Sequence, residues 1–471
     1  MKIIKMACLA LVASASIGTV HAGGMLTNTN QNIAFLRNPA REAAIGIDGI
    51  YSNPAGVAFL GQGTHMSLNW QAAFQTRTVY TSSPLLDHTL SGDMKTKRYK
   101  GNAQVPFIPS VQVAHNMGKW SFQFGFAISG GGGKCEFDKG LGSFESTVGG
   151  LAMLMKEKTK PLGVLGIPGV QSYDMEGYMQ GSQYYFGFTL GAAYKVTENL
   201  SVYGGVRALY GTATYEASIS DIIINGNQHL NHYIDNLSAT VSQIPPSMLP
   251  PGTAESLAAV SGYKYGVSLK SDQTGFGIAP IIGVDYKLGT FNFAGKYEFR
   301  TRMRMKNKSN LETPMMPALA SYVDGTKVRE DSPALLALGA QWSVKPNMRL
   351  NLGYHHFYDK QSKKADDKQE LLSGGTNEYL GGFEWDTTDR VTVSLGAQVT
   401  RYGLTDEYMS DISFVTNSWS LGFGCKYKVN DNVTLQAAYL KTFYDKYKTA
   451  NGMNEFTRTN DVIGVGCDIE F

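Results

Sequence analysis

The residues of this sequence best suited to chemistry are cations that recur at alternate positions. From 296 to 304 every second residue is charged, in the order Lys296, Glu298, Arg300, Arg302 and Arg304. Alternate residues of a strand share one face, so this stretch predicts a ladder of arginines, which bind carboxylates bidentately. Alternatively, the arginines pair with acidic residues of neighbouring strands, and Arg302 and Arg304 lie at the rim. Arg207, on another predicted strand, has the same two interpretations.

Catalytic and metal-binding patterns are absent from the sequence. It has no Gly-x-Ser-x-Gly, His-Glu-x-x-His or acidic calcium-loop motif, and its histidines are scattered. Cys135, Cys425 and Cys467 are widely spaced and odd in number, which favours neither a disulfide framework nor a zinc site. His355 shares a predicted face with Asn351, which favours a hydrogen-bonded interior histidine over a general base. We therefore predict no enzyme, no catalytic or metal residues and no cofactor.

The beginning of the chain has the features of an export signal. Lys2 and Lys5 precede an apolar stretch that is too short to cross a bilayer, and Val20-His21-Ala22 ends in a small residue. We predict a signal peptide over 1–22 and a mature chain from about Gly23. Removing the two lysines leaves 40 of the 42 basic residues against 39 acidic ones, so nothing in the charge indicates a nucleic-acid partner.

Alternation of apolar and polar residues dominates the chain from residue 66 onward and predicts fourteen strands. Short turns alternate with long connections, as in outer-membrane barrels. The long connections are expected at roughly 76–106, 130–182, 214–272, 306–332, 358–375, 402–416 and 446–459. The predicted fold is all-β, a 14-stranded antiparallel transmembrane barrel over 63–471 with an N-terminal segment over 23–62.

The two faces of these strands indicate which one meets lipid. All five tryptophans lie on the apolar face, whereas the other face is small or polar, as expected of a barrel interior and not of a solvated sheet. The last alternating strand ends in Phe471, like the signal that the barrel assembly machinery reads. These features predict an integral protein of the bacterial outer membrane.

Some long connections are unusually apolar. One of them carries Leu151, Leu154, Met155 and Leu165, and another carries Met248 and Leu249. They could pack on themselves as a cap, or form an outer groove that captures apolar ligands. Flexible Met side chains suit a variable acyl chain, and each buried methylene contributes about 0.8 kcal/mol.

A turn motif, Asn53-Pro54-Ala55, lies directly before the first strand. Asn53 can cap a helical turn, and Pro54 fits its first position, where no amide hydrogen is needed. On local physics alone this is a capped turn between two segments. An earlier Asn38-Pro39-Ala40 repeats the motif farther from the strands.

With these residues in place, the chain resembles the FadL/TodX family of long-chain fatty acid and hydrocarbon transporters. The resemblance covers the mature chain in layout, with Tyr51-Ser52-Asn53-Pro54-Ala55-Gly56 as its closest motif. It implies that residues 23–62 fold inside the barrel as a hatch, with Asn53, Pro54 and Ala55 as its gate near a kinked third strand. It also implies capture in an outer loop groove, then a tighter lumen pocket, then lateral release through a window. Gly130–Gly133 is expected to end the third strand.

The resulting hypothesis is passive transport of hydrophobic compounds, with fatty acids preferred, by a monomer surrounded by lipid and lipopolysaccharide. Ligand-binding residues are expected in the loop groove (Leu151, Leu154, Met155, Leu165, Met248, Leu249) and in the lumen (Arg207, Lys296, Arg300, Arg302). The alternatives are an aromatic hydrocarbon channel and a non-transporting adhesin or phage receptor. A polar-solute porin is disfavoured by the predicted plug.

Overall fold

A closed antiparallel barrel forms the body of the protein in a computed structural model, which describes residues 27–165, 168–249, 251–311 and 321–471. Predictions for the signal peptide and for residues 23–26 fall outside this part. The long strands at the start of the chain are β1 (Gly63–Ser83), β2 (Lys95–Met117), β3 (Trp120–Phe137), β4 (Tyr173–Lys195), β5 (Leu200–Ile224) and β7 (Val267–Leu288).

The remaining strands complete the ring. They are β8 (Phe291–Glu298), β9 (Arg304–Leu311), β10 (Lys327–Arg329), β11 (Leu335–Lys345), β12 (Met348–Phe357), β13 (Thr376–Asp386), β14 (Val391–Arg401), β15 (Ser418–Lys428), β16 (Val433–Tyr444) and β18 (Asn454–Glu470), with the short β6 (Gln228–His229) and β17 (Tyr447–Lys448). β8 with β9, and β10 with β11, each occupy one position of the wall, and β18 pairs with β1. The described chain thus forms the predicted 14-stranded barrel.

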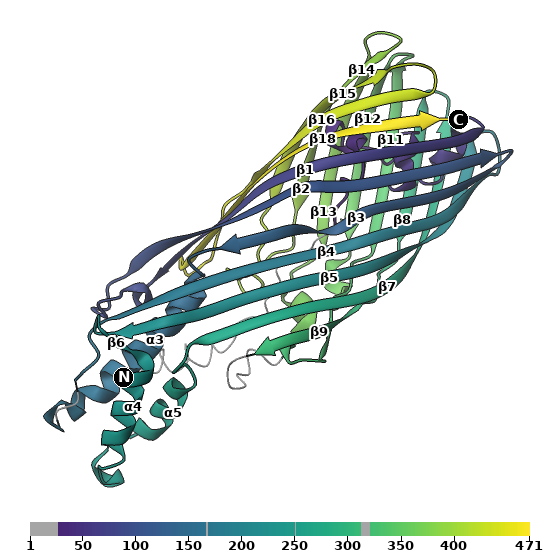
Figure 1. Ribbon diagram of the computed structural model, residues 1–471. Coiled ribbons are helices and arrows are strands. Elements are labelled where there is room, and N and C mark those ends of the chain that lie inside the picture. Colours follow the sequence, from purple (N-terminus) through teal and green to yellow (C-terminus); the bar gives the residue numbers. More distant parts are fainter. Residues whose placement is uncertain (1–26, 166–167, 250, 312–320) are drawn as a thin grey trace.

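The strands differ sharply in length around the ring. β5 has 25 residues and β7 has 22, whereas β12 has 10 and β13 has 11. Figure 1 shows the long strands projecting on one side of the barrel. The prediction of loops throughout 76–106, 130–182 and 214–272 was therefore wrong, because strands occupy the ends of all three segments. These strand ends lack a purely apolar outer face, so their alternation is weak in the sequence.

The outer face is apolar over the common part of the barrel. All five tryptophans have outward, exposed side chains, with exposed fractions from 36% to 47%. Inward positions on β1, β2 and β3 carry buried polar residues such as Ser67, Asn69, Gln112 and Gln123. An apolar outer face with polar inward side chains is unfavourable in water but favourable in a lipid bilayer. None of the helices in the described residues is both long and apolar enough to cross a membrane.

The third wall strand, β3, bulges at its glycines. Its register with β4 shifts between Ile128 and Gly130 and again between Gly131 and Gly133. Gly131 has a φ of 93°, and a Cβ there would lie 2.0 Å from the Gln183 carbonyl oxygen, so only glycine fits. The prediction that Gly130–Gly133 ends the strand was wrong, because β3 continues to Phe137.

The seventh wall position is also interrupted, between β8 and β9. Seven residue steps of β7, from Thr274 to Ile281, lie opposite eight steps of its partner, from Glu298 to Lys306. One extra residue in a strand moves every following side chain to the other face of the sheet. Lys296 and Glu298 therefore point inward, but Arg302 and Arg304 are exposed on the outside. The predicted arginine ladder on one inward face was wrong.

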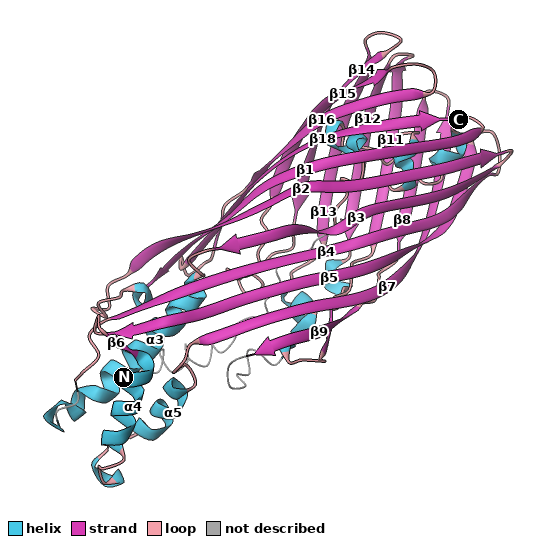
Figure 2. Cartoon of the chain, viewed as in Figure 1, coloured by secondary structure: helices cyan, strands magenta, loops and turns pink. Residues whose placement is uncertain are grey.

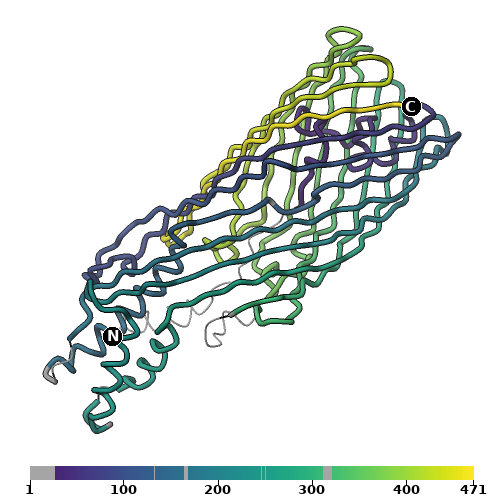
Figure 3. The backbone as a smooth tube through the Cα atoms, in the orientation of Figure 1, coloured from purple at the N-terminus to yellow at the C-terminus, as the bar shows by residue number. Residues whose placement is uncertain are grey.

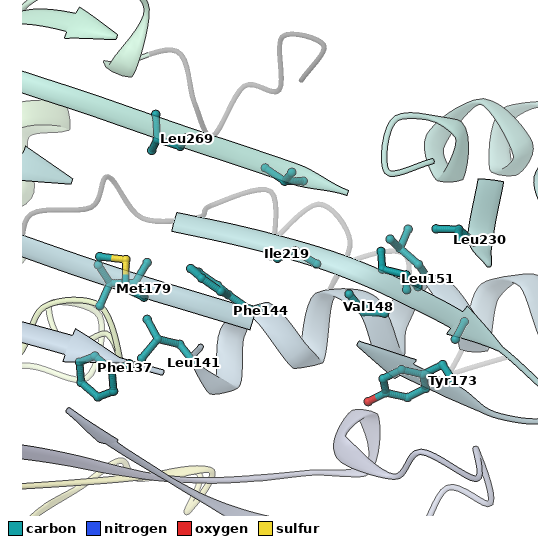
Figure 4. Close-up of a cluster of buried hydrophobic side chains, with 14 of the residues drawn as sticks. Phe137, Leu141, Phe144, Val148, Leu151, Tyr173, Met179, Ile219, Leu230 and Leu269 are labelled. Carbon is teal, nitrogen blue, oxygen red and sulfur yellow. The ribbon is translucent and has the colours of Figure 1, made fainter. Parts of the chain in front are cut away.

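Helices occupy the lumen and the long-loop end (Figures 2 and 3). The lumen holds α2 (Ile33–Arg37) and the 3-10 helices η1 (Ile47–Ile50) and η2 (Gly56–Phe59). Beyond the strands lie α3 (Gly142–Thr159), α4 (Leu230–Val241) and α5 (Thr253–Ser261), with 3-10 helices at Pro84–Leu86, Lys160–Leu165, Pro246–Met248, Asp359–Gln361 and Ala365–Leu371. The largest apolar core lies where α3 packs on the projecting strands, with Phe144, Val148 and Leu151 facing Ile219 and Tyr173 (Figure 4).

Candidate functional site: the lumen segment, the wall gap and the helical cap

The lumen segment, defined here as residues 27–62, is held to the barrel wall by buried ion pairs near the short-turn end. Arg37, at the end of α2, donates to Glu384 of β13 and to Ser394 of β14. Arg41 binds the second oxygen of Glu384 at 3.2 Å and also pairs with Asp48 at 2.8 Å. All four charged residues are almost fully buried. Breaking such a pair leaves a buried charge uncompensated, so these contacts fix the segment firmly.

Two of the predicted lumen cations also hold this segment. Arg207 Nη1 donates to both oxygens of Glu298 at 2.8 Å, and its guanidinium lies 4.9 Å from the ring centroid of Tyr51. Lys296 donates to the Tyr51 carbonyl oxygen and lies 4.0 Å from the same ring. Both residues are inward and buried, as predicted, but their contacts are with the protein itself.

The other two predicted cations lie elsewhere. Arg300 donates to the Gln361 carbonyl oxygen and lies 3.6 Å from Asp331, at the long-loop rim. Arg302 is exposed outside the wall, because of the extra residue in the seventh wall position. The structure therefore does not gather Arg207, Lys296, Arg300 and Arg302 around one ligand.

Asn53, Pro54 and Ala55 form a turn that is fastened to three strands. The Asn53 side chain accepts from Gly56 N at 3.2 Å and donates to Asp285 of β7. The Pro54 carbonyl accepts from Gln123 of β3 at 2.7 Å, and the Ala55 carbonyl accepts from Ser201 of β5 at 2.6 Å. The expected proximity to the third strand is present. All these wall residues are near the short turns, so the turn has the contacts of an anchor.

A histidine links the lumen segment to β12 and β13 of the wall. His355 of β12 contacts Glu42 at 2.7 Å through Nε2 and Glu378 of β13 at 2.8 Å through Nδ1. Glu378 also accepts from Gln398 and Thr400. The interior position predicted for His355 is therefore correct, and the residue belongs to a buried network that joins the segment to the wall.

A gap interrupts the barrel wall between β2 and β3. The two strands pair at Ser110 with Ala127 and again at Ala103 with Cys135, but not in between. The start of the lumen segment lies against this gap, where Thr27 forms an isolated bridge with Gly130. Asn28 N donates to the Ser129 carbonyl at 3.0 Å, and its side chain donates to the carbonyls of Ile128 and Gly131 at 3.2 and 3.1 Å. The chain's own backbone thus substitutes for the missing strand partner.

A cavity of about 190 Å³ lies in the lumen beside this gap. Its lining includes Asn28 of the lumen segment, Val105 of β2, Ile128 of β3 and two arginines, Arg77 and Arg458. Both arginines fall in segments predicted to be long loops, so neither was predicted as a lumen residue. Only the pairing of the strands brings these two arginines together, since Arg77 of β1 lies directly opposite Arg458 of β18.

The helical cap, defined as α3, α4 and α5, encloses a much smaller apolar cavity of about 20 Å³. Leu154 and Met155 line it together with Leu237, Val241, Leu257 and Val260. Leu151 is instead buried in the core beneath, Leu249 packs against that core, and Met248 is 75% exposed. The side chain of Leu165 lies outside the described part. The helices pack on one another, as the cap interpretation predicts, and a small apolar cavity remains between them. Capture of an apolar ligand by these loops stays a prediction.

The helical cap is connected to the lumen cavity through one loop. Asp411, between β14 and β15, accepts from Ser143 N at 2.7 Å and so caps the start of α3. Burial raises the pKa of the Asp411 carboxyl. In the same loop, Val415 lines the lumen cavity and Phe414 lies over Arg77.

Solved structures with a similar fold identify the type of barrel. A Pseudomonas aeruginosa FadL homologue aligns with a TM-score of 0.63 at 12% identity, over 95% of this chain and all of the other. The chain has the fold of the FadL and TodX transporters. The P. putida toluene transporter TodX aligns with a TM-score of 0.55 at 14% identity, over 90% of this chain and 94% of its own.

A third solved structure has a similar fold. The CymD monoaromatic hydrocarbon channel aligns with a TM-score of 0.53 at 13% identity, over 94% of this chain and 99% of its own. No protein-family model matches the sequence, and no curated protein does. Fold and lipid-facing band together are those of an integral outer-membrane barrel. Within the described residues, no group of three or more His, Cys, Asp or Glu could hold a metal ion.

Proposed function

We propose that this protein is a passive outer-membrane channel for hydrophobic compounds, with long-chain fatty acids as its substrates. The gap between β2 and β3, filled by Thr27 and Asn28, carries this proposal. A wall that opens sideways is useful to a solute that partitions into lipid, whereas a polar solute needs a continuous aqueous path. Residues 27–30 are the gate, and the remainder of the lumen segment holds it in place.

The route begins at the helical cap and ends in the membrane. An acyl chain enters among Leu154, Met155 and Leu257, where the helices separate to enlarge the small cavity. It then passes the loop that carries Asp411 and Phe414 and reaches the lumen cavity. Displacement of Asn28 from Ser129 opens the wall, and the chain leaves between β2 and β3. The compound moves down its own gradient, without an energy source or cofactor.

Uptake of labelled compounds tests this function. Cells without the gene should take up radiolabelled oleate more slowly, and the restored gene should recover the rate. Loss of toluene uptake with normal oleate uptake would favour the second candidate, an aromatic hydrocarbon channel, which the similar fold of the toluene transporter TodX and the monoaromatic hydrocarbon channel CymD supports. Normal uptake of both compounds would overturn transport and favour an adhesin or phage receptor.

A further inference from the structure

Two arginines face each other in the lumen cavity without a counter-charge. Arg77 and Arg458 are directly opposite in the ladder between β1 and β18, and both line the cavity. Directly opposed side chains on one face of such a pair have Cβ atoms about 5 Å apart, and like charges there are destabilising. Each guanidinium also lies near a ring, Arg77 at 6.0 Å from the centroid of Phe414 and Arg458 at 5.0 Å from that of Tyr444.

Neither arginine has an acidic partner among the described residues. Arg77 is 9% exposed, and its Nε has no hydrogen-bond partner. The Nε of Arg458 also has none, and its Nη2 donates only to the Gln75 side-chain oxygen, at 3.3 Å. Glu378 lines the same cavity, but its oxygens already bind His355, Gln398 and Thr400.

Three other arginines of the same lumen are almost fully buried. Arg37, Arg41 and Arg207 each bind a carboxylate of the protein. Buried charges are normally paired in this way because unpaired burial is unfavourable. Two adjacent, unpaired guanidinium groups at a cavity are therefore a site prepared for an anion.

We propose that Arg77 and Arg458 form a subsite for a doubly charged headgroup, a phosphate monoester or a dicarboxylate, on a hydrophobic chain. A dianion matches the two positive charges, whereas one carboxylate leaves one guanidinium unpaired. Two guanidinium forks also supply more donors than a single carboxylate can accept. This inference rests on the proposed route for hydrophobic compounds, and it extends that route from monocarboxylates to amphiphiles with a doubly charged headgroup.

The cavity also orients the rest of such a molecule. Val105, Ile108 and Ile128 line it on the side of the wall gap, where Gly131 and Gly133 also border it. A headgroup bound by the arginines therefore directs its chain along apolar side chains toward the gap between β2 and β3. The headgroup is held in the lumen while the tail meets the membrane first.

Isothermal titration of purified protein in a neutral detergent at pH 8 tests the subsite with three eight-carbon probes. Octyl phosphate carries about two charges at this pH, octanoate carries one, and 1-octanol carries none. We expect octyl phosphate to bind about tenfold more tightly than octanoate, and octanoate more tightly than octanol. Arg77→Gln should reduce the affinity for octyl phosphate to that for octanoate, and Arg77→Gln with Arg458→Gln should make all three probes equal.

Arg302→Gln is the matched control, because it removes an outward arginine and should leave the order unchanged. Equal affinity of the wild type for octyl phosphate and octanoate would overturn the dianion assignment. Unchanged affinities in the double variant, or an equal loss for all probes including octanol, would overturn the subsite. Oleate uptake is measured separately, so normal binding order without any uptake would refute the proposed function and leave the subsite standing.

Discussion

The two ends of the lumen segment are attached to the barrel by different kinds of bond. Residues 37–60 hold the wall through buried ion pairs and through a turn bound to three strands, whereas Thr27 and Asn28 hold the wall gap through neutral hydrogen bonds to backbone. Charged contacts of this kind are costly to break, and each neutral hydrogen bond contributes about 0.5–1.5 kcal/mol. The segment can therefore release one end while the other stays fixed.

The largest expected effect comes from removing the charge at the centre of the anchor. Glu384→Gln leaves Arg37 and Arg41 without their shared carboxylate, which should weaken attachment by about 3–5 kcal/mol. Hydrogen exchange of the amides in residues 33–60 should accelerate strongly, and single-channel recordings should show a leak. Glu370→Gln, at an exposed ion pair with Lys363, should change neither. Slow exchange in the Glu384 variant would mean that the ion pairs are not the anchor.

The next effect is a reversible block at the wall gap. Thr27→Cys with Gly130→Cys, in a background where Cys135, Cys425 and Cys467 are Ser, places two thiols at a bridge between neighbouring backbones. Oxidation should lower fatty acid uptake by about tenfold or more, since the gate can no longer leave the gap, and a reductant should restore it. Thr27→Cys alone should be insensitive to oxidation. Full uptake by the cross-linked barrel would place the exit elsewhere.

A smaller and opposite effect is expected from weakening the gate. Asn28→Ala removes two side-chain hydrogen bonds to the carbonyls of Ile128 and Gly131, which together stabilise the closed gap by about 1–3 kcal/mol. Initial uptake rates in proteoliposomes should rise by a few-fold. A fall in rate would indicate that Asn28 guides the substrate instead of closing the wall.

The smallest effect is expected at the turn. Pro54→Gly keeps the carbonyl that Gln123 binds, but it should lower stability by about 0.4–1 kcal/mol through the entropy of the unfolded chain. Thermal denaturation should detect this loss, while oleate uptake should remain at the wild-type rate. Altered uptake would show that Asn53-Pro54-Ala55 belongs to the gate, as the family resemblance implied, and would remove the division between the two ends.

The sequence predicted best those features that the bilayer imposes. Lipid requires an apolar outer face over about ten residues per strand, so Trp120, Trp342 and Trp419 marked their strands and the count of fourteen was correct. Beyond the bilayer the same strands lack this requirement. The 25 residues of β5 therefore looked like a short strand followed by a loop.

The alternation of apolar and polar residues could not predict two features of the candidate site. A single extra residue between Glu298 and Arg304 exchanges the faces of the strand, so Arg302 lies outside although its spacing places it inside. Arg77 and Arg458 lie far apart in the sequence, and only the pairing of β1 with β18 brings them together. The turn at Asn53 was recognisable locally, but its three partners come from β3, β5 and β7, which only the closed ring assembles.

The unequal lengths of the strands have a consequence for where a substrate first meets the protein. At about 3.3 Å per residue, the 25 residues of β5 extend roughly 80 Å, while about ten residues suffice to cross the apolar band. Even with the tilt of about 35–45° that barrel strands have, we therefore expect the helical cap to lie some tens of Å above the hydrocarbon, within the sugar layer of an outer membrane. Shortening β4 to β7 in register should matter little in cells whose surface sugars are truncated. The same change should slow uptake where those sugars are complete.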